Sequence, residues 1–290
     1  MTKNNMDKIY IKTPAKLNVR LKVIGRRPNG YHDLVSIMAP ITLFDELELE
    51  KSVSEITLTS EGFRVPNNAD NLVYRAAELF LKQAGLKAGV QIKLKKGIPV
   101  AAGMGGGSSD AAATLRSLNE LFSRPFSFAE LSSMAVQLGA DVPFFLQPRP
   151  CIARGIGEIL EPIENWPEMR YVIVHPPLEI STAWVYANLK LGLTGDEDGY
   201  IRKCLKFRFS SIASILENDL EQVTIAHYPV IDSIKSHLLK AGAEGALMTG
   251  SGPTVFGLFS SLDKAQTAAH DLAAFKLGDI FVVTHWQGQM

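Results

Sequence analysis

Five short runs of alternating apolar and polar residues restrict the fold of this 290-residue chain more than any other feature. They occupy residues 8–12, 19–23, 46–50, 56–59 and 90–94. Alternation with a period of two is typical of a strand that has one face in the core and the other in solvent. A doubly wound parallel sheet would instead need continuously apolar strands. We therefore predict a largely antiparallel or mixed sheet, which disfavours a Rossmann fold.

Helical spacing adds an α component to these strands. Helices are expected between Asp70 and Gly85, from Ser108 onward, and after the capping box Ser127–Glu130. The second half should contain a loop at 192–200, helices at 230–241 and 263–275, and strands at 171–174, 246–248, 255–259 and 280–283. The predicted fold is therefore α/β of the α+β type, with domains at 1–160 and 161–290.

The charge balance and the lack of long apolar segments exclude several classes of protein. The 30 Lys and Arg residues equal the 30 Asp and Glu residues, so no overall field attracts nucleic acid or anionic lipid. The apolar stretches 143–146 and 171–174 are far shorter than the ~20 residues of a membrane span. Cys151 and Cys204 are too few for a disulfide framework, and no secretory signal is recognisable. We expect a cytoplasmic protein without nucleic-acid or membrane partners.

The strongest chemical signal is a glycine and serine segment at residues 99–110, directly before a predicted helix. Glycines let successive backbone N–H groups converge on an anion, and a helix N-terminus adds about half a positive charge. The segment lacks the lysine of a Walker A loop, and Ser108 stands where a G-x-G-x-x-G motif requires glycine. It favours phosphate binding by another kind of loop, although a serine-capped turn would have the same composition.

Four further segments have ordinary structural explanations when each is taken alone. Lys16 would then be a solvated surface lysine, His32 a structural histidine and Asp141 a cap or turn residue. The segment 249–254 would be a glycine turn between two strands. None of these residues identifies a function by itself.

Taken together, five segments resemble motifs of the GHMP small-molecule kinases in their order along the chain and in their residues. They are Pro14–Asn18, Gly30–His32, Pro99–Ser109, Ala140–Phe144 and Gly250–Thr254. The resemblance implies a two-domain GHMP kinase architecture, with a ribosomal-protein-like N-terminal domain and a ferredoxin-like C-terminal domain. It also implies an active site in the cleft between the domains, with ATP and Mg²⁺ as cofactors.

The second and fourth of these segments resemble one branch of the family and imply its substrate. That branch transfers the γ-phosphoryl group of ATP to the 2-hydroxyl of a cytidine diphosphate-linked methylerythritol, in the non-mevalonate isoprenoid pathway. A monomer or weak homodimer is expected. The alternatives are a sibling kinase for mevalonate, homoserine or a sugar, and a non-catalytic ligand sensor. The pair Tyr31-His32 argues against the sibling kinases, and the intact Lys16 and Asp141 argue against the sensor.

Matched residue by residue, the resemblance implies a role for each site residue. Asp141 corresponds to the catalytic base and Lys16 to its partner, a pairing that favours the charged carboxylate. The ATP loop corresponds to Pro99, Val100, Ala101, Ala102, Gly103, Met104, Gly105, Gly106, Gly107, Ser108 and Ser109. The substrate-binding positions correspond to Asn18, Tyr31, His32, Thr182 and Tyr186. The two tyrosines would stack on opposite faces of the cytosine ring.

The resemblance leaves the metal ligands open. No second carboxylate clearly matches the Mg²⁺-binding glutamate of other GHMP kinases, and Ser109 is the remaining candidate. Asp110 stands where some relatives carry asparagine, and Tyr186 stands at a position associated with phenylalanine. The tyrosine would preserve stacking and could add a hydrogen bond.

Overall fold

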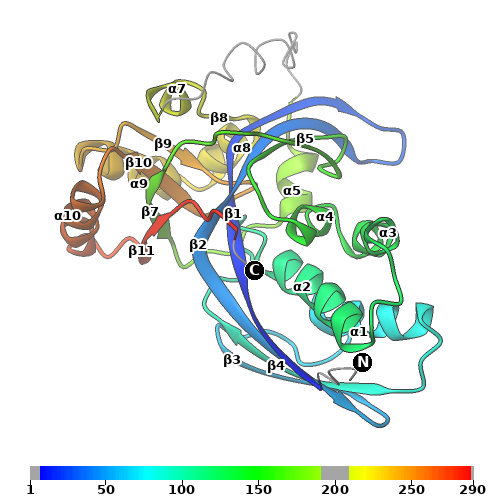
Figure 1. Cartoon of the computed structure of the whole chain (residues 1–290). Helices are drawn as coiled ribbons and strands as arrows, with labels where there is room; N and C mark the ends of the chain where they lie inside the picture. Colours follow the sequence, from blue (N-terminus) through cyan, green and yellow to red (C-terminus); the bar gives the residue numbers. More distant parts are fainter. Residues whose placement is uncertain (1–6, 191–208, 289–290) are drawn as a thin grey trace.

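Two β-sheets form the frame of the molecule (Figure 1). The computed structural model describes residues 7–190 and 209–288, so the predicted loop at 192–200 and Cys204 lie outside the described residues. The larger sheet contains β1 (Lys8–Arg26), β2 (His32–Ser52), β3 (Ile56–Gly62), β4 (Gly89–Lys96), β5 (Cys151–Arg154), β6 (Ile159–Pro162) and β8 (Glu217–Asn218). The smaller sheet contains β7 (Arg170–His175), β9 (Gly245–Met248), β10 (Val255–Phe259) and β11 (Asp279–Thr284).

Most strand pairs in the two sheets are antiparallel. The larger sheet has the order β3-β4-β2-β1-β8, with β5 paired to β2 and β6 paired to β5. Its parallel pairs among the described strands are β3–β4 and β1–β8. The smaller sheet has the order β11-β7-β10-β9 and pairs antiparallel throughout. The prediction of a mixed sheet, and of an α/β fold of the α+β type, is confirmed.

Strands β1 and β2 form one long hairpin that runs through the molecule (Figure 1). The alternating runs at 8–12, 19–23 and 46–50 predicted only parts of it. Residues 13–21 of β1 are all buried, because both faces of the strand are covered there, although Lys16, Asn18 and Arg20 alternate with apolar residues in the sequence. The hairpin therefore carries a buried stretch of chain into the centre of the molecule.

Helices pack against both sheets (Figure 1). Helices α1 (Leu72–Gln83) and α2 (Gly106–Leu121) lie against the larger sheet, and α3 (Phe128–Leu138) and α4 (Val142–Leu146) pack on these two helices. The other described helices are α5 (Thr182–Ala187), α7 (Phe209–Ser214), α8 (Asp219–His227), α9 (Val230–Lys240) and α10 (Leu262–Ala273). Helices α9 and α10 lie against the smaller sheet. No helix in the described part of the chain has the length and apolar character needed to cross a membrane.

The helix boundaries agree with the predictions except at α2. The capping box at Ser127–Glu130 is present at the start of α3. Helix α2 begins at Gly106 rather than at the predicted Ser108, because Gly105, in the left-handed conformation, is the residue that ends the loop. Gly107 and Ser108 therefore lie in the first helical turn. Their backbone N–H groups belong to a helix N-terminus, not to a flexible loop.

Three apolar clusters hold these elements together. The first lies between the larger sheet and the helices α1 to α4 and includes Phe80. The second joins the two sheets, because it contains Leu17 of β1 together with Tyr171 of β7 and Phe256 of β10. The third lies under α8, α9 and α10. The second cluster fixes the smaller sheet against the β1–β2 hairpin.

The domain division at 1–160 and 161–290 stays a prediction. The strands of the larger sheet come from residues up to Pro162, with the exception of β8. Strand β8 returns from the second half of the chain and pairs with β1 at Arg20 and Leu21. The two proposed domains therefore share a sheet edge.

The capping box of α3 yields a test of local stability. In Ser127→Ala the N–H group of Glu130 loses its acceptor, the Ser127 hydroxyl, so we expect the free energy of unfolding to fall by about 1 kcal/mol in urea denaturation. Ser133→Ala is the matched control, because Ser133 is exposed within the same helix and caps nothing. Equal unfolding midpoints for the two variants would contradict the assigned cap.

Candidate active site

A cleft of about 1010 Å³ opens beside the buried part of β1. Its walls come from β1 and β2, from the loop between β4 and α2, and from the first turns of α1 and α2. The residue before α4, helix α5 and the turn between β9 and β10 complete it. Ligand pockets usually enclose ~300–1,000 Å³, so this cleft offers room for more than one small molecule.

Lys16 and Asp141 meet in this cleft. Lys16 lies on β1 with 3% of its surface exposed, and its Nζ is 3.5 Å from Oδ2 of Asp141. Asp141 directly precedes α4, makes no side-chain cap, and keeps 39% of its side chain exposed. The expectation of a solvated Lys16 is wrong, because β1 is covered on both faces at this point. A buried ammonium group needs acceptors, so the pair keeps a solvent-accessible carboxylate next to a fixed cation.

The loop between β4 and α2 has a backbone that favours glycine at two positions. Gly103 and Gly105 have φ angles of +71° and +70°. A Cβ atom on Gly103 would lie 2.3 Å from the carbonyl oxygen of Thr249, and one on Gly105 would lie 3.3 Å from Cε of Lys16. The loop therefore packs directly against the lysine and against the β9–β10 turn.

The first turn of α2 presents backbone N–H groups to the cleft. Gly105 precedes the helix and provides no side-chain cap, and Gly106, Gly107 and Ser108 line the cleft. The first amides of a helix have no acceptor within it, and the helix dipole makes this end positive. The arrangement suits a phosphate group.

Most predicted site residues line the cleft. From the predicted ATP loop, these are Pro99, Val100, Ala101, Ala102, Gly103, Gly105, Gly106, Gly107 and Ser108. From the predicted substrate positions, they are Asn18, Tyr31, His32, Thr182 and Tyr186. Met104 instead belongs to the apolar cluster between the sheets. The Ser109 hydroxyl is buried outside the cleft lining, without a hydrogen-bond partner among the described residues.

Aromatic residues form one wall of the cleft. The rings of His32 and Tyr186 are stacked, with centroids 5.1 Å apart and planes inclined by 28°. Burial and the charge of Arg26 lower the pKa of His32, so its imidazole is neutral at pH near 7. Burial and the nearby Asp141 raise the pKa of Tyr186. Tyr31 is 57% exposed, so its ring is free to move onto a ligand.

The turn at residues 249–254 forms another wall, which the predicted site residues did not include. Gly250 and Ser251 line the cleft. The Ser251 and Thr182 hydroxyl oxygens lie 2.8 Å apart, and the side-chain amide of Asn218 donates to the carbonyl of Gly250 at 2.8 Å. The motif was recognisable in the sequence, but only the fold brings it beside the glycine loop.

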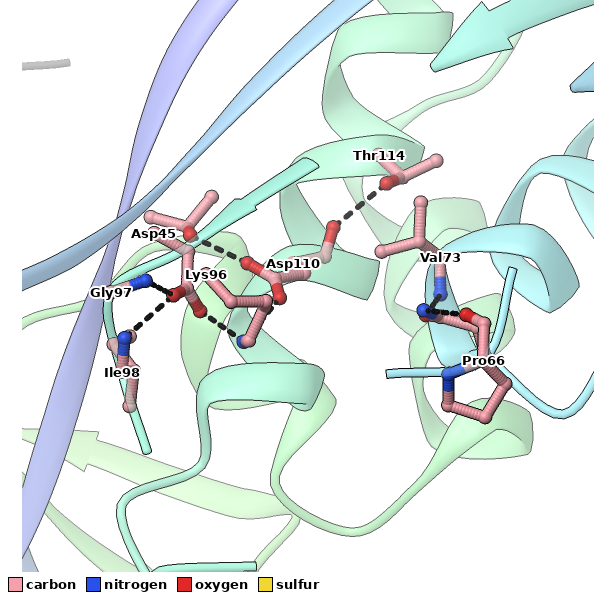
Figure 2. Close-up of polar contacts among 10 residues, drawn as sticks. Asp45, Pro66, Val73, Lys96, Gly97, Ile98, Asp110 and Thr114 are labelled. Atoms are coloured by element: carbon pink, nitrogen blue, oxygen red, sulfur yellow. Dashed lines mark hydrogen bonds and ion pairs between the residues drawn. The ribbon is translucent and has the colours of Figure 1, made fainter. Parts of the chain in front are cut away.

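A buried charge cluster lies beneath the glycine loop and was not predicted (Figure 2). Lys96, at the end of β4, donates to Asp45 of β2 and to Asp110 of α2, the latter at 2.9 Å. Asp45 also accepts the backbone N–H groups of Gly97 and Ile98, at 2.7 and 2.8 Å. The cluster therefore fixes the point where the chain leaves β4 for the loop.

Two carboxylates share one lysine in this cluster, and the pKa values of Asp45 and Lys96 are both shifted. Burial and the neighbouring Asp110 raise the pKa of Asp45 to about 7, although Lys96 and the Ile98 N–H oppose the rise. Burial acts to lower the pKa of Lys96, but the two carboxylates outweigh it and raise that pKa. Asp110 also accepts the Thr13 hydroxyl at 2.6 Å, so both of its oxygens are engaged.

Two family descriptions match the chain. The family described as "GHMP kinases N terminal domain" matches residues 71–148, which include the glycine loop, α2 and Asp141. The family described as "GHMP kinases C terminal" matches residues 200–276. The chain belongs to the GHMP kinase family. The predicted family is confirmed, and a role as a small-molecule kinase implies ATP as the phosphoryl donor.

Individual relatives of this GHMP kinase cover nearly its whole length. A 4-diphosphocytidyl-2-C-methyl-D-erythritol kinase of Geobacter metallireducens is 47% identical over 279 residues, which are 96% of this chain and 98% of the relative. A protein of the same name from Pelotomaculum thermopropionicum is 48% identical over 88% of this chain and 90% of its own. Such coverage leaves no large part of either relative unmatched.

Solved structures place the chain in the same family. A crystal structure of 4-(cytidine 5'-diphospho)-2C-methyl-D-erythritol kinase matches with a TM-score of 0.81 and 37% identity, over 97% of this chain and 100% of that chain. A homoserine kinase from Cytophaga hutchinsonii matches with a TM-score of 0.77 over 97% of this chain and 96% of that chain, at 21% identity. The second match shows a shared fold alone. The predicted GHMP kinase fold is confirmed.

The Asp45 titration predicts a pH-dependent difference in stability. Because the folded-state pKa of Asp45 is raised, its contribution is fully present at low pH and is lost as pH rises through about 7. The free energy of unfolding of wild type minus that of Asp45→Asn should therefore fall from about pH 4 to about pH 7, by at most ~1.4 kcal/mol per pH unit, and level off above about pH 8.

Urea denaturation of both proteins at each pH would measure this difference. Taking the difference removes histidine contributions of the opposite sign, since burial lowers the pKa values of His175 and His285. A difference that stays constant over this range would contradict the raised pKa of Asp45.

Proposed function

We propose that the protein transfers the γ-phosphoryl group of ATP to the 2-hydroxyl of 4-diphosphocytidyl-2-C-methyl-D-erythritol, a step of the non-mevalonate isoprenoid pathway. The relatives of that name, at 47% and 48% identity over most of both chains, support the acceptor. The Lys16–Asp141 pair in the cleft supports the phosphoryl transfer. The same relatives favour this function over a mevalonate or homoserine kinase and over a ligand sensor.

In this proposal Asp141 is the general base. Its carboxylate is accessible from the cleft and would accept the proton of the 2-hydroxyl as the oxygen attacks the γ-phosphorus. A positioned base contributes about 10²–10⁴-fold to such a reaction. The hydroxyl must lie within hydrogen-bond distance of Asp141, which places the methylerythritol part of the substrate beside α4.

Lys16 would hold the reacting groups together. Its ammonium group has three N–H donors, of which one points to Asn18 and another faces Asp141. The remaining donor can reach the transferred phosphoryl group. The cation would then attract the negative charge on the phosphoryl oxygens while it keeps Asp141 in place.

The glycine loop and the first turn of α2 would bind the phosphates of ATP. Gly106, Gly107 and Ser108 offer helix N-terminal amides, and the Gly103 backbone is fixed against Thr249. This contact needs no basic side chain. It agrees with a chain whose net charge is zero.

Mg²⁺ fits this cleft as an ion bound mainly by phosphates. Within the described ranges no three His, Cys, Asp or Glu side chains cluster to hold a metal. Mg²⁺ commonly takes one or two protein oxygens and fills its other positions with phosphate and water. The cleft offers the Ser108 hydroxyl and the Asp141 carboxylate, whereas Asp110 is engaged by Lys96 and Thr13. Bound there, the ion would neutralise charge on the phosphates.

The aromatic wall would bind the cytosine ring. His32 already covers one face of Tyr186, so a base that stacks on Tyr186 must use the other face or displace the imidazole. The exposed Tyr31 would close over the opposite face of the base. Thr182 and Asn18 also line the cleft and would contact the rest of the substrate.

An acceptor panel tests the proposed function. ADP release with ATP and Mg²⁺ should be observed with the cytidylylated methylerythritol and not with mevalonate or homoserine. Cytidine diphosphate alone is the control, since it fits the aromatic wall but has no 2-hydroxyl on a methylerythritol. Turnover confined to mevalonate or homoserine would overturn the proposed substrate.

Replacement of the proposed base tests the chemistry. In Asp141→Asn the kcat should fall by about 10²–10⁴-fold, because an amide cannot accept the proton, while ATP still binds at the loop. Asp263→Asn is the matched control: Asp263 is exposed on α10 and does not line the cleft. Near-wild-type kcat in Asp141→Asn would remove the assigned base.

A further inference from the structure

A chain of hydrogen bonds leads away from Lys16 into the core of the hairpin. Lys16 Nζ donates to Oδ1 of Asn18, whose Nδ2 donates to the Ser36 hydroxyl oxygen at 2.8 Å. The Ser36 hydroxyl donates in turn to the backbone carbonyl of Arg20 at 2.7 Å. Lys16, Asn18 and Ser36 line the cleft, but each is at most 4% exposed, so water has little access to these contacts.

The direction of every bond in this chain is fixed by its last member. A carbonyl oxygen only accepts, so the hydroxyl hydrogen of Ser36 must point to Arg20. The Ser36 oxygen is then an acceptor, and Asn18 must turn its NH₂ group toward it. Oδ1 of Asn18 consequently faces Lys16. The Lys16 ammonium only donates, so it requires the same orientation, and Ser36 holds the other end of the amide in place.

The strand geometry explains why this chain forms where it does. Lys16 and Asn18 are two residues apart on β1 and so lie on the same face of the strand. A bulge then shifts the register between Asn18 and Arg20. Bulges interrupt the regular ladder and redirect neighbouring groups, and here the carbonyl of Arg20 accepts a side-chain hydroxyl from β2.

We propose that Ser36 is a positioning residue for the phosphoryl transfer: it anchors the Asn18 NH₂ group, so that the Asn18 carbonyl oxygen holds Lys16 beside Asp141. The inference rests on the proposed function only in taking Lys16 and Asp141 as the reacting pair. Ser36 acts here through Asn18 rather than on ATP.

Loss of the Ser36 hydroxyl would release this anchor. In Ser36→Ala the Asn18 NH₂ group loses its acceptor in a buried site, so the amide is held only through its contact with Lys16. The unanchored amide and the ammonium group bonded to it can then shift together. The ammonium would then leave its position 3.5 Å from Asp141.

Steady-state kinetics of Ser36→Ala test the proposal. We expect kcat to fall by about tenfold while the KM for ATP changes by less than about twofold, because the glycine loop is untouched. Ser36→Thr retains the hydroxyl and should recover most of the loss. A purely structural role would not separate kcat from KM in this way.

Ser117→Ala is the matched control for loss of a buried hydroxyl. Ser117 is 2% exposed on α2, outside the cleft lining, and its hydroxyl has no hydrogen-bond partner among the described residues. Its kcat should match wild type. Equal kcat values for Ser36→Ala and Ser117→Ala, or a loss in Ser36→Ala confined to KM, would overturn the proposal.

The proposal stays testable if Ser36→Ala does not fold, or if the proposed substrate is not phosphorylated. If Ser36→Ala does not fold, Ser36→Cys preserves the volume with a weaker donor and acceptor, and an unchanged kcat there would overturn the proposal. All assays use the acceptor that wild type phosphorylates fastest, so rejection of the cytidylylated compound leaves the Ser36 test intact. A crystal structure of Ser36→Ala with Asn18 and Lys16 unmoved would also count against it.

Discussion

Two buried ammonium groups, those of Lys16 and Lys96, determine the arrangement of the chain around the cleft. A charge removed from water is costly unless acceptors surround it, so each lysine must find partners wherever the fold can supply them. Their side-chain acceptors are Asn18, Asp45, Asp110 and Asp141. These residues lie on β1, on β2, on α2 and directly before α4. Pairing the lysines therefore ties both helices to the hairpin and sets the distance between the cleft walls.

The second half of the chain closes the cleft through a contact between two glycine turns. The Thr249 hydroxyl accepts the backbone N–H of Asn18 at 2.9 Å, and its carbonyl oxygen lies where a side chain on Gly103 would have to fit. A Cβ atom on Gly250 would likewise lie 3.0 Å from the carbonyl oxygen of Gly103. The glycines at these positions are thus required by close approach of backbone to backbone. The loop proposed for ATP is held by the second half of the chain as well as by the first.

The alternating runs contain evidence for part of this site that the sequence predictions did not use. In β4 the exposed positions are Gln91, Lys93 and Lys95, so Lys96 belongs to the buried face of the strand. In β2, Asp45 likewise lies on the same buried face as Leu47 and Leu49. A charged residue at each of two buried positions predicts a buried ion pair. By contrast, the alternation of residues 15–21 assigns Lys16 to a polar, solvated face of β1, whereas both faces of the strand are buried there. No local pattern relates Lys16 to Ser36 or to Asp141, which only the register and the chain path bring together.

The zero net charge of the chain has a consequence for how a triphosphate would be held. Lys96 with Asp45 and Asp110 contributes no positive charge to the cleft, and Lys16 is largely balanced by Asp141. Arg26 also lines the cleft, near His32, so the positive potential at the glycine loop itself comes from the amides at the start of α2, which act only within about one helical turn. Side-chain cations therefore cannot compensate for a displaced loop. The backbone geometry at Gly103 and Gly105, together with a metal ion carried by the phosphates, has to provide what a basic cleft would otherwise supply.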